Sequence, residues 1–309
     1  MGGRHLKPYL SVYGHVTIDT IFAIDQFLPP GITADALSKK TALGGTGPNI
    51  AVTAARLGCP TALCAFIGHD MPGAYLDLMR DSGLMMDDVV TVDLETSSCV
   101  IINDRDLVTR VFFFQGPQGC ADTLGITLDG MAKRSEHVHF CTGQPSYYLG
   151  LMKGLRGGPR IALDPAQEVH KVWNADLVRD AIPLSDALFC NELEARAICG
   201  YLGIDDVLDA GPGLVVRTDG DRGSVARVGG ETLSVPLVDA VRAVDVTGAG
   251  DSYRAGFYTA LYRGYEVPEA LVIASSVASF VVEEVGALTN TPTWDQALER
   301  AEPYFGAIH

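Results

Sequence analysis

Short apolar runs alternate with helix-like segments along most of this 309-residue chain. Such alternation is typical of a mostly parallel sheet with helices on both faces, because parallel strands need long crossover connections. The sequence therefore predicts an α/β fold. Its strands are expected at residues 9–14, 61–67, 137–141, 160–163, 187–190 and 214–217, with another ending at Val244, and its helices at 49–57, 73–82 and 294–304.

Two regions break this rhythm. Ile18–Ile24 with Ala36–Leu43, and Cys99–Phe114, are β-rich and have no helix between them. Segments of this kind pair with each other rather than with strands that alternate with helices. We therefore expect a small separate sheet.

Charge, cysteine content and the lack of long apolar runs limit the partners and the cellular location that we expect. The formal net charge is −15, which argues against nucleic acid or an anionic membrane as a partner. The seven cysteines form no Cys-x-x-Cys pair, so we interpret them as reduced core thiols. No basic-then-apolar leader begins the chain, and no apolar run approaches the ~18 residues that span a bilayer. Together these features predict a cytoplasmic protein.

The stretch Asp245–Phe257 carries the strongest functional pattern. Gly248-Ala249-Gly250 forms a turn that opens a helix, and glycines let a ligand approach the backbone closely. The first N–H groups of a helix lack intrahelical partners and bind anions. Asp251 follows at once, and a carboxylate there would repel a bound phosphate. It fits a general base that takes a proton from a hydroxyl while the turn holds the transferred phosphoryl group. A plain helix N-cap is the alternative.

This stretch resembles the second signature of the ribokinase (PfkB-type) family of carbohydrate and nucleoside kinases. That signature reads Asp-Thr-x-Gly-Ala-Gly-Asp, and Val246 stands where Thr is usual. The family's first signature, a Gly-Gly pair followed by Asn and a small-residue helix, is matched by Gly44–Gly58. The two signatures occur in the order that this fold requires.

The resemblance implies a ribokinase-like three-layer α/β/α sandwich with a mostly parallel central sheet and a small β-sheet lid. It assigns residues 1–17, 44–97 and 116–309 to the core domain, and residues 18–43 and 98–115 to the lid. It also implies ATP as phosphate donor, Mg²⁺ as cofactor, Asp251 as base and Gly248-Ala249-Gly250 as anion hole. Because a lid exposes a face and an edge, pairing of lids in a homodimer would cover them.

On the acceptor side, the resemblance assigns sugar hydroxyls to Asp19, Gly44, Gly45 and Asn49. Asp19 follows the first predicted strand, and parallel sheets bind ligands at the carboxyl ends of their strands. A carboxylate and an amide offer acceptors and donors to neighbouring hydroxyls. The alternatives are a turn residue for Asp19 and a helix cap for Asn49.

On the nucleotide side, Asn191 and Glu194 match the family's Asn-x-x-Glu element, which organises Mg²⁺ and its waters near the phosphates. Carboxylate and amide oxygens suit this hard cation, usually through water. An ordinary helix start is the alternative.

A second nucleotide element lies further along the chain. Thr218, Gly220 and Gly223 resemble the family's Thr-x-Gly-x-x-Gly turn, although a plain strand turn fits the same residues. Ser275, at the start of a small-residue helix, is assigned to the ATP side as well. The chain has no Gly-x-x-x-x-Gly-Lys-Ser/Thr sequence, which excludes a P-loop kinase.

Some family members use a monovalent cation. The resemblance implies a K⁺ site at Asp245, Thr247, Val281, Glu284, Gly286 and Asn290, with Asn290 standing where Ser is common. The alternative for the later residues is a helix C-terminus capped by glycine.

Four further polar residues lie near predicted strand ends. His137 and His139 are one residue apart, so they would face the same side of a strand, and either a two-histidine metal site or structural histidines would fit. Asp164 follows another strand and fits a supporting role in the acceptor pocket. His15 matches no motif, and we interpret it as structural.

The acceptor is the least constrained feature. Residues 251–257, 278–283 and 289–295, and residues 142–145 with 164–167, resemble the archaeal nucleoside kinase branch, which implies transfer to a nucleoside 5′-hydroxyl with broad base tolerance. A sugar or sugar-phosphate kinase is the alternative. A sugar phosphate would need a cationic pocket, and the lid segments offer only Lys39, Lys40, Arg105 and Arg110. A non-catalytic binding protein on the same fold is a third possibility.

Overall fold

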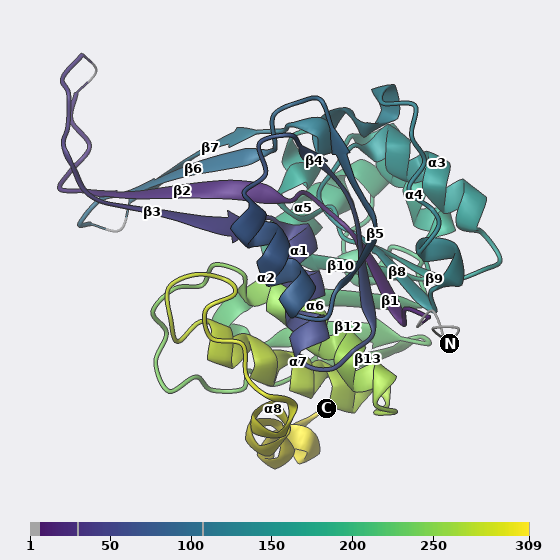
Figure 1. Cartoon of the computed structure of the whole chain (residues 1–309). Coiled ribbons are helices and arrows are strands. Elements are labelled where there is room, and N and C mark those ends of the chain that lie inside the picture. Colours follow the sequence, from purple (N-terminus) through teal and green to yellow (C-terminus); the bar gives the residue numbers. More distant parts are fainter. Residues whose placement is uncertain (1–6, 30, 107, 309) are drawn as a thin grey trace, which may run out of the picture.

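The computed structural model describes residues 7–29, 31–106 and 108–308. Of the domains expected from the sequence, residues 1–6 and 309 of the core and residues 30 and 107 of the lid lie outside the described residues. Figure 1 shows a large sheet within a body of helices and a small sheet that extends away from that body.

The large sheet has the strand order β13-β12-β11-β10-β9-β8-β1-β4-β5. Its strands run parallel from β5 to β11, and β12 and β13 add an antiparallel hairpin at one edge. The bounds are β1 (Leu10–Tyr13), β4 (Thr61–Gly68), β5 (Met85–Val92), β8 (His137–Phe140), β9 (Arg160–Leu163), β10 (Ala187–Asn191), β11 (Leu214–Thr218), β12 (Ser224–Val228) and β13 (Glu231–Val235).

Helices cover both faces of the large sheet, which gives the three layers expected from the sequence (Figure 1). On one face pack α1 (Thr46–Arg56), α2 (Gly73–Asp81), α6 (Ala249–Tyr262), α7 (Val267–Val281) and α8 (Trp294–Ala301). On the other face pack α3 (Pro145–Leu155), α4 (Ala175–Ala181) and α5 (Glu192–Leu202). Short 3₁₀ helices include η1 (Pro117–Thr123), η3 (Ala166–His170), η6 (Gly220–Arg222) and η7 (Glu302–Ala307).

The central strands are apolar because both of their faces are covered. In β1, Leu10 and Val12 pack on the α1 side, whereas Tyr13 packs on the α3 side, and all three are fully buried. Strands buried in this way hold the loops at their carboxyl ends in fixed positions, and the site described below is built from those loops.

The small sheet has the order β3-β2-β6-β7. Its strands are β2 (Thr17–Ile24), β3 (Ala36–Gly44), β6 (Ser98–Asn103) and β7 (Thr109–Phe114). Strand β2 pairs antiparallel with β3 and parallel with β6, and β6 pairs antiparallel with β7. The Asp104 carboxylate accepts the Asp106 and Val108 amides, which forms the turn between β6 and β7. We call this four-stranded sheet the lid.

The expected strand ending at Val244 is wrong. No strand lies between β13 and α6 in the described chain, and Val244 is 48% exposed, because no neighbouring strand offers it a partner. Several helix limits also differ from expectation, and Ser275 lies in the middle of α7 rather than at the start of a helix. Helix α1 begins at Thr46 instead of Asn49, so Pro48 stands third in the helix, and α8 ends at Ala301 before continuing as η7.

Across residues 7–29, 31–106 and 108–308, none of the helices combines the length and the apolar character needed to cross a bilayer.

Candidate active site

The two signature segments meet at the first turns of α1 and α6. The Nδ2 of Asn49 on α1 donates a hydrogen bond of 2.8 Å to Oδ2 of Asp251 on α6. The two residues are 202 positions apart in the chain. This contact joins the residue that we expected to bind the acceptor to the residue that we expected to act as base.

The turn before α6 has the conformation that its glycines allow. Gly248 has φ +78, and a Cβ there would lie 2.3 Å from Cβ of Ala287, so a side chain is excluded on both counts. The Ala249 amide donates to the Val246 carbonyl at 3.2 Å, and the Ser252 amide donates to the Gly248 carbonyl at 2.8 Å. The turn therefore packs tightly against the loop after α7.

Asp251 is partly exposed at the head of α6. Burial raises the pKa of its carboxyl to about 6, against the lowering effects of the Asn49 hydrogen bond and the nearby Arg254, while the charge of Asp164 raises it further. A carboxyl with this pKa is ionised at neutral pH yet basic enough to accept a proton, as a general base requires.

The glycine pair of the first signature packs against the start of the lid. A Cβ on Gly44 would lie 2.0 Å from Oδ2 of Asp19, and a Cβ on Gly45 would lie 2.1 Å from the His15 carbonyl oxygen. Gly45 also has φ +94. The Asp19 carboxylate accepts a 2.5 Å hydrogen bond from Oγ1 of Thr17, and burial raises the pKa of its carboxyl. Asp19 is thus held beside the two glycines with which we grouped it.

A polar cluster that the sequence analysis did not assemble lies beside this region. His15 is 1% exposed, and neither of its ring nitrogens has a hydrogen-bond partner among the described residues. Its Nδ1 is 3.9 Å from Oε1 of Glu168, which is also buried. The Glu168 carboxylate accepts Nε2 of Gln115 at 2.9 Å and the Gly143 amide at 2.6 Å. His15 is thus enclosed among Glu168, Gln115 and Phe113, and the structural role that we expected for it stays a prediction.

The lid register connects this cluster to Asp19. Asp19 pairs with Cys99 on β6, and Cys99 pairs with Phe113 on β7, so the three side chains lie on one face of the lid. Two strand spacings separate Asp19 from Phe113, which is about 10 Å. The Phe113 ring meets the His15 ring edge-on at 5.1 Å. Phe113 and Gln115 also line a hollow of about 680 Å³.

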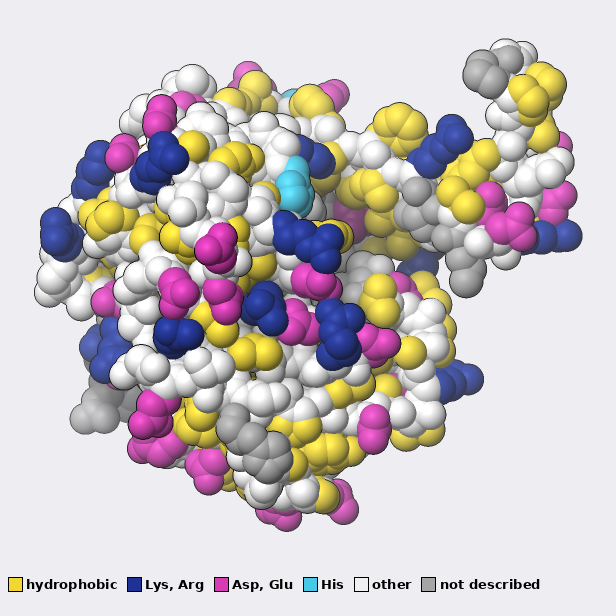
Figure 2. Space-filling model, turned by 180° about the vertical axis from the view of Figure 1, so that it is seen from behind, with side chains coloured by type: hydrophobic (Ala, Val, Ile, Leu, Met, Phe, Trp, Pro, Cys, Tyr) yellow, Lys and Arg dark blue, Asp and Glu magenta, His cyan; other side chains and the backbone are white. Residues whose placement is uncertain are grey.

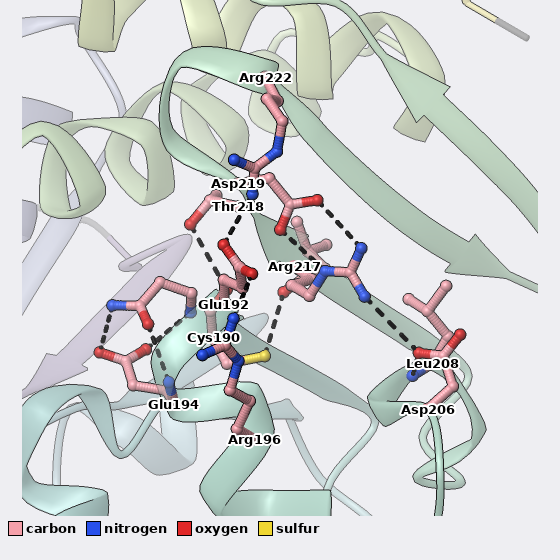
Figure 3. Close-up of polar contacts among 12 residues, drawn as sticks. Cys190, Glu192, Glu194, Arg196, Asp206, Leu208, Arg217, Thr218, Asp219 and Arg222 are labelled. Carbon is pink, nitrogen blue, oxygen red and sulfur yellow. Dashed lines mark hydrogen bonds and ion pairs between the residues drawn. The ribbon is translucent and has the colours of Figure 1, made fainter.

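On the nucleotide side, Asn191 caps α5 and is bound in a capping box to Glu194, the residue labelled in Figure 3. Both carboxylate oxygens of Glu194 accept a hydrogen bond of 2.8 Å from Asn191, one from its backbone N–H and one from its side-chain Nδ2. Burial, followed by the charge of Asp164, raises the pKa of Glu194 to about 7. Thr218 is the β11 partner of Asn191, so these two strand ends lie side by side.

The other residues expected near ATP have local structural contacts. Gly220 and Gly223 have φ +62 and +85, and a Cβ on Gly223 would lie 2.3 Å from the Val235 carbonyl oxygen. Buried Ser275 accepts the Val238 amide at 2.9 Å and so holds the segment that leads to the second signature. Figure 3 also shows the contact between Arg222 of η6 and Glu192 of α5, in which Arg222 donates a hydrogen bond of 2.7 Å. The assignment of Gly220, Gly223 and Ser275 to the ATP site stays a prediction.

The expected monovalent-cation residues cluster around the loop after α7. Asp245 accepts the Thr247 amide at 2.9 Å through Oδ1 and the Gly286 amide at 3.0 Å through Oδ2. Nδ2 of Asn290 donates to the Phe280 carbonyl at 2.6 Å, and the Glu284 amide donates to the carbonyl of buried Val281 at 3.5 Å. The structure brings these residues together but does not test whether they hold an ion.

Both histidines of β8 make side-chain contacts within the described chain. No group of three or more His, Cys, Asp or Glu side chains in the described ranges could hold a metal ion. His139 is hydrogen-bonded to Asp164 and Tyr258, and His137 packs against the rings of Tyr9 and Tyr258. Asp164, which we expected to support the acceptor pocket, forms a buried ion pair with Arg254, and its role at that pocket stays a prediction.

The model of pfkB family carbohydrate kinases matches residues 7–142 and 157–294. A nucleoside kinase of Methanothermobacter thermautotrophicus is 34% identical over 96% of both chains, and one of Methanocaldococcus jannaschii is 31% identical over 98% of this chain and 99% of its own. A Haemophilus influenzae ribokinase is 26% identical over 96% of this chain and 99% of its own. The crystal structure of a Methanocaldococcus jannaschii nucleoside kinase superposes with a TM-score of 0.88 at 29% identity, covering 96% of this chain and 99% of that one.

Proposed function

This chain belongs to the pfkB family of carbohydrate kinases, and from that premise we propose that it transfers the γ-phosphoryl group of ATP to the 5′-hydroxyl of a nucleoside. It is a phosphotransferase with a hydroxyl acceptor and ATP as donor. The observation that carries the proposal is the hydrogen bond between Asn49 and Asp251, which brings an acceptor-binding amide within 2.8 Å of a base.

We assign the proton transfer to Asp251. Its ionised carboxylate accepts the proton of the 5′-hydroxyl as that oxygen forms a bond to the γ-phosphorus. The bond from this phosphorus to the β,γ-bridging oxygen breaks, ADP leaves, and the proton remains on Asp251 until solvent takes it. Backbone N–H groups of the 248–250 turn hold the charge on the transferred group. The Asn49 amide keeps the carboxylate oriented throughout.

Asn191 and Glu194 fit Mg²⁺ held through water. Each Glu194 oxygen already accepts one bond from Asn191, which leaves lone pairs for metal-bound water rather than for direct ligation. Bound there, the ion would neutralise charge on the phosphates. We expect Glu194→Gln to raise the Mg²⁺ concentration needed for half-maximal rate while leaving the acceptor KM unchanged. An unchanged Mg²⁺ dependence would remove Glu194 from this role.

The acceptor face of the lid favours a nucleoside over a free sugar. A ribose bound at Asp19 leaves Phe113 out of reach, since the two lie about 10 Å apart. A base attached to that ribose would reach the Phe113 ring, which packs edge-on against the buried His15 ring.

A panel of nucleosides and sugars, assayed for ADP release at saturating Mg-ATP, tests the acceptor class. We expect kcat/KM for the best nucleoside to exceed that for ribose, fructose and fructose 6-phosphate. Stacking on an aromatic ring contributes about 1–3 kcal/mol per base, so Phe113→Ala should lower kcat/KM for nucleosides about tenfold and leave ribose unaffected. Val241→Ala is the control, because Val241 is 85% exposed and lies outside the lid. A free sugar that outperforms every nucleoside would make this a sugar kinase.

We also propose K⁺ at the loop after α7. The Asp245 carboxylate and the surrounding carbonyl oxygens are acceptors only, which fits a cation without strong geometric demands. The expected result is a higher rate in KCl than in choline chloride at equal ionic strength. Equal rates would exclude the ion from the reaction.

We further propose a homodimer formed through the lids. Figure 2 shows the lid extending from the body with hydrophobic side chains over its surface. Phe112 and Phe114 are 61% and 51% exposed on one face of β7. Light scattering should give the mass of a dimer, and Phe112→Asp should give a monomer, whereas Val241→Asp, at an exposed valine outside the lid, should not. A monomeric wild-type protein would contradict this assembly.

A cytoplasmic location remains part of the proposal. All seven cysteines are free and five are buried, which suits a reducing compartment.

A further inference from the structure

A buried ion pair lies behind the signature turn. Arg254, one helical turn after Asp251, donates from Nε to Oδ2 of Asp164 at 2.8 Å and from Nη2 to Oδ1 at 3.5 Å. Both side chains are about 5% exposed. Ion pairs buried to this degree contribute little to stability compared with apolar residues of the same volume, because both charges lose their hydration. Stability alone therefore gives a weak reason for placing the pair here.

The pair is fixed from a second side. Nε2 of His139 lies 3.2 Å from Oδ2 of Asp164, and Nδ1 lies 2.9 Å from the Tyr258 hydroxyl. Burial lowers the pKa of His139, so the ring is neutral: it donates from Nε2 to Asp164 and accepts at Nδ1 from Tyr258. Arg254 and His139 hold the pKa of Asp164 below its usual value although burial opposes them. Asp164 is consequently an ionised anchor for the guanidinium.

The remaining nitrogen of Arg254 reaches the signature turn. Nη1 donates to the Gly250 carbonyl at 3.3 Å, and a Cβ on Gly250 would lie 3.3 Å from that nitrogen. The guanidinium therefore lies directly against the turn. Its charge also acts on both Asp251 and Glu194.

We propose that Arg254, anchored by Asp164, is a positioning residue for phosphoryl transfer: it fixes the Gly250 end of the turn and supplies the permanent positive charge that keeps Asp251 ionised. The inference rests on the proposed role of Asp251 but not on the identity of the acceptor. Without Arg254, the carboxyls of Asp164, Glu194 and Asp251 would share one largely buried region, and like charges in such a region drive protonation.

The groups facing Asp251 come from five elements. They are Asn49 of α1, Cys141 after β8, Asp164 after β9, Glu194 of α5 and Arg254 of α6. Burial raises the pKa of Cys141 well above its usual value, so its thiol is neutral, and Asn49 is uncharged. Arg254 is the cation of this set, and its removal changes the charge balance around Asp251 in one direction.

The test compares Arg254→Gln, Arg254→Lys and the control Arg263→Gln over a range of pH. Arg263 lies at the other end of α6, where it donates to the Leu57 carbonyl at 2.9 Å and covers the Trp294 ring. We expect Arg254→Gln to lower kcat at least tenfold, to change the KM of Mg-ATP less than threefold, and to move the acid limb of the kcat/KM profile upward by about 1 pH unit. Arg254→Lys keeps the charge and should restore the wild-type limb, with kcat still reduced because Lys lacks the planar fork. Arg263→Gln should leave the limb in place.

Two results would overturn the proposal: a wild-type acid limb in Arg254→Gln, or a limb in Arg254→Lys displaced as far as that of the Gln variant. If Arg254→Gln does not fold, the Lys variant and Asp164→Asn decide: loss of the anchor should lower kcat, whereas loss of the Asp164 charge, which raises the pKa of Asp251, should move the limb downward. The profiles are measured with whichever acceptor the wild type prefers. A sugar acceptor would thus contradict the nucleoside proposal and leave the role of Arg254 open to the same measurement.

Discussion

The pH dependence of kcat/KM tests the environment of Asp251, because it reports the pKa of this carboxyl. This parameter follows the ionisation of the free enzyme. With the pKa of Asp251 at about 6, about one tenth of the carboxyl is ionised at pH 5 and about nine tenths at pH 7. We therefore expect kcat/KM to rise about tenfold between these two pH values and then to level off.

Replacing Asn49 should move that rise. A hydrogen bond to a charged group contributes about 1.5–3 kcal/mol, which corresponds to about 1–2 pH units at 1.36 kcal/mol per unit. The 2.8 Å bond from Nδ2 of Asn49 stabilises the ionised form of Asp251, so its loss in Asn49→Ala raises the pKa. The midpoint should move from about 6 to about 7–8. Loss of acceptor contacts by the same side chain lowers the plateau without moving the midpoint.

The control is Asn174→Ala. Asn174 caps α4 by accepting the Asp176 and Leu177 amides at 3.0 Å. Its removal should destabilise the protein by about 1 kcal/mol and leave the midpoint unchanged. Ionisation of ATP itself affects all three proteins alike, so the difference between their midpoints is the quantity to measure. A midpoint in Asn49→Ala that stays with the wild type would refute the proposed action of this amide on Asp251.

Three further substitutions test the site. Asp251→Asn should lower kcat by about 10²–10⁴ with unchanged ATP binding by calorimetry, and a near wild-type kcat would exclude Asp251 as the base. Asp19→Ala should raise the acceptor KM more than tenfold through loss of about 1.5–3 kcal/mol. If the KM of Mg-ATP rose instead, the two half-sites would have to be exchanged. Gly44→Ala places a Cβ 2.0 Å from Oδ2 of Asp19, so it should also raise the acceptor KM. The control Gly150→Ala meets nothing within 4 Å and should not.

The sequence predicted the fold well wherever burial is two-sided. Strands such as β1 and β4 are mostly apolar and buried throughout, and their alternation with helices indicated the parallel sheet. The β12–β13 hairpin was missed because it lies at an edge and carries polar residues, although Gly229-Gly230 is a hairpin turn signal. Strand β5 was missed for a related reason, since Asp87 and Asp88 lie within it at the opposite edge. At Val244 the opposite error occurred: the apolar segment predicted a strand, but in the described structure no strand lies beside it and none forms.

The active site was predictable only where a local pattern exists. The glycines and Asp251 lie within short signatures, so their grouping followed from the sequence. The His15, Gln115 and Glu168 cluster is drawn from separate segments, and no spacing in the chain connects them. The available signal was weaker: His15 and Glu168 each follow a strand of a parallel sheet, so their loops open at the same edge.

The arrangement around Arg254 explains why several residues that looked unrelated in the sequence are needed together. Three carboxyls, those of Asp164, Glu194 and Asp251, surround one guanidinium in a region largely closed to water. Asp164 is neutralised by the ion pair, so in the proposed mechanism the two remaining carboxyls are those of Asp251, the base, and of Glu194, whose pKa burial raises to about 7. A fully neutral, apolar lining would stabilise the fold more but would leave no group to accept the hydroxyl proton. Because Asp251 must be both partly desolvated and ionised, a permanent cation behind it is the arrangement that satisfies both conditions.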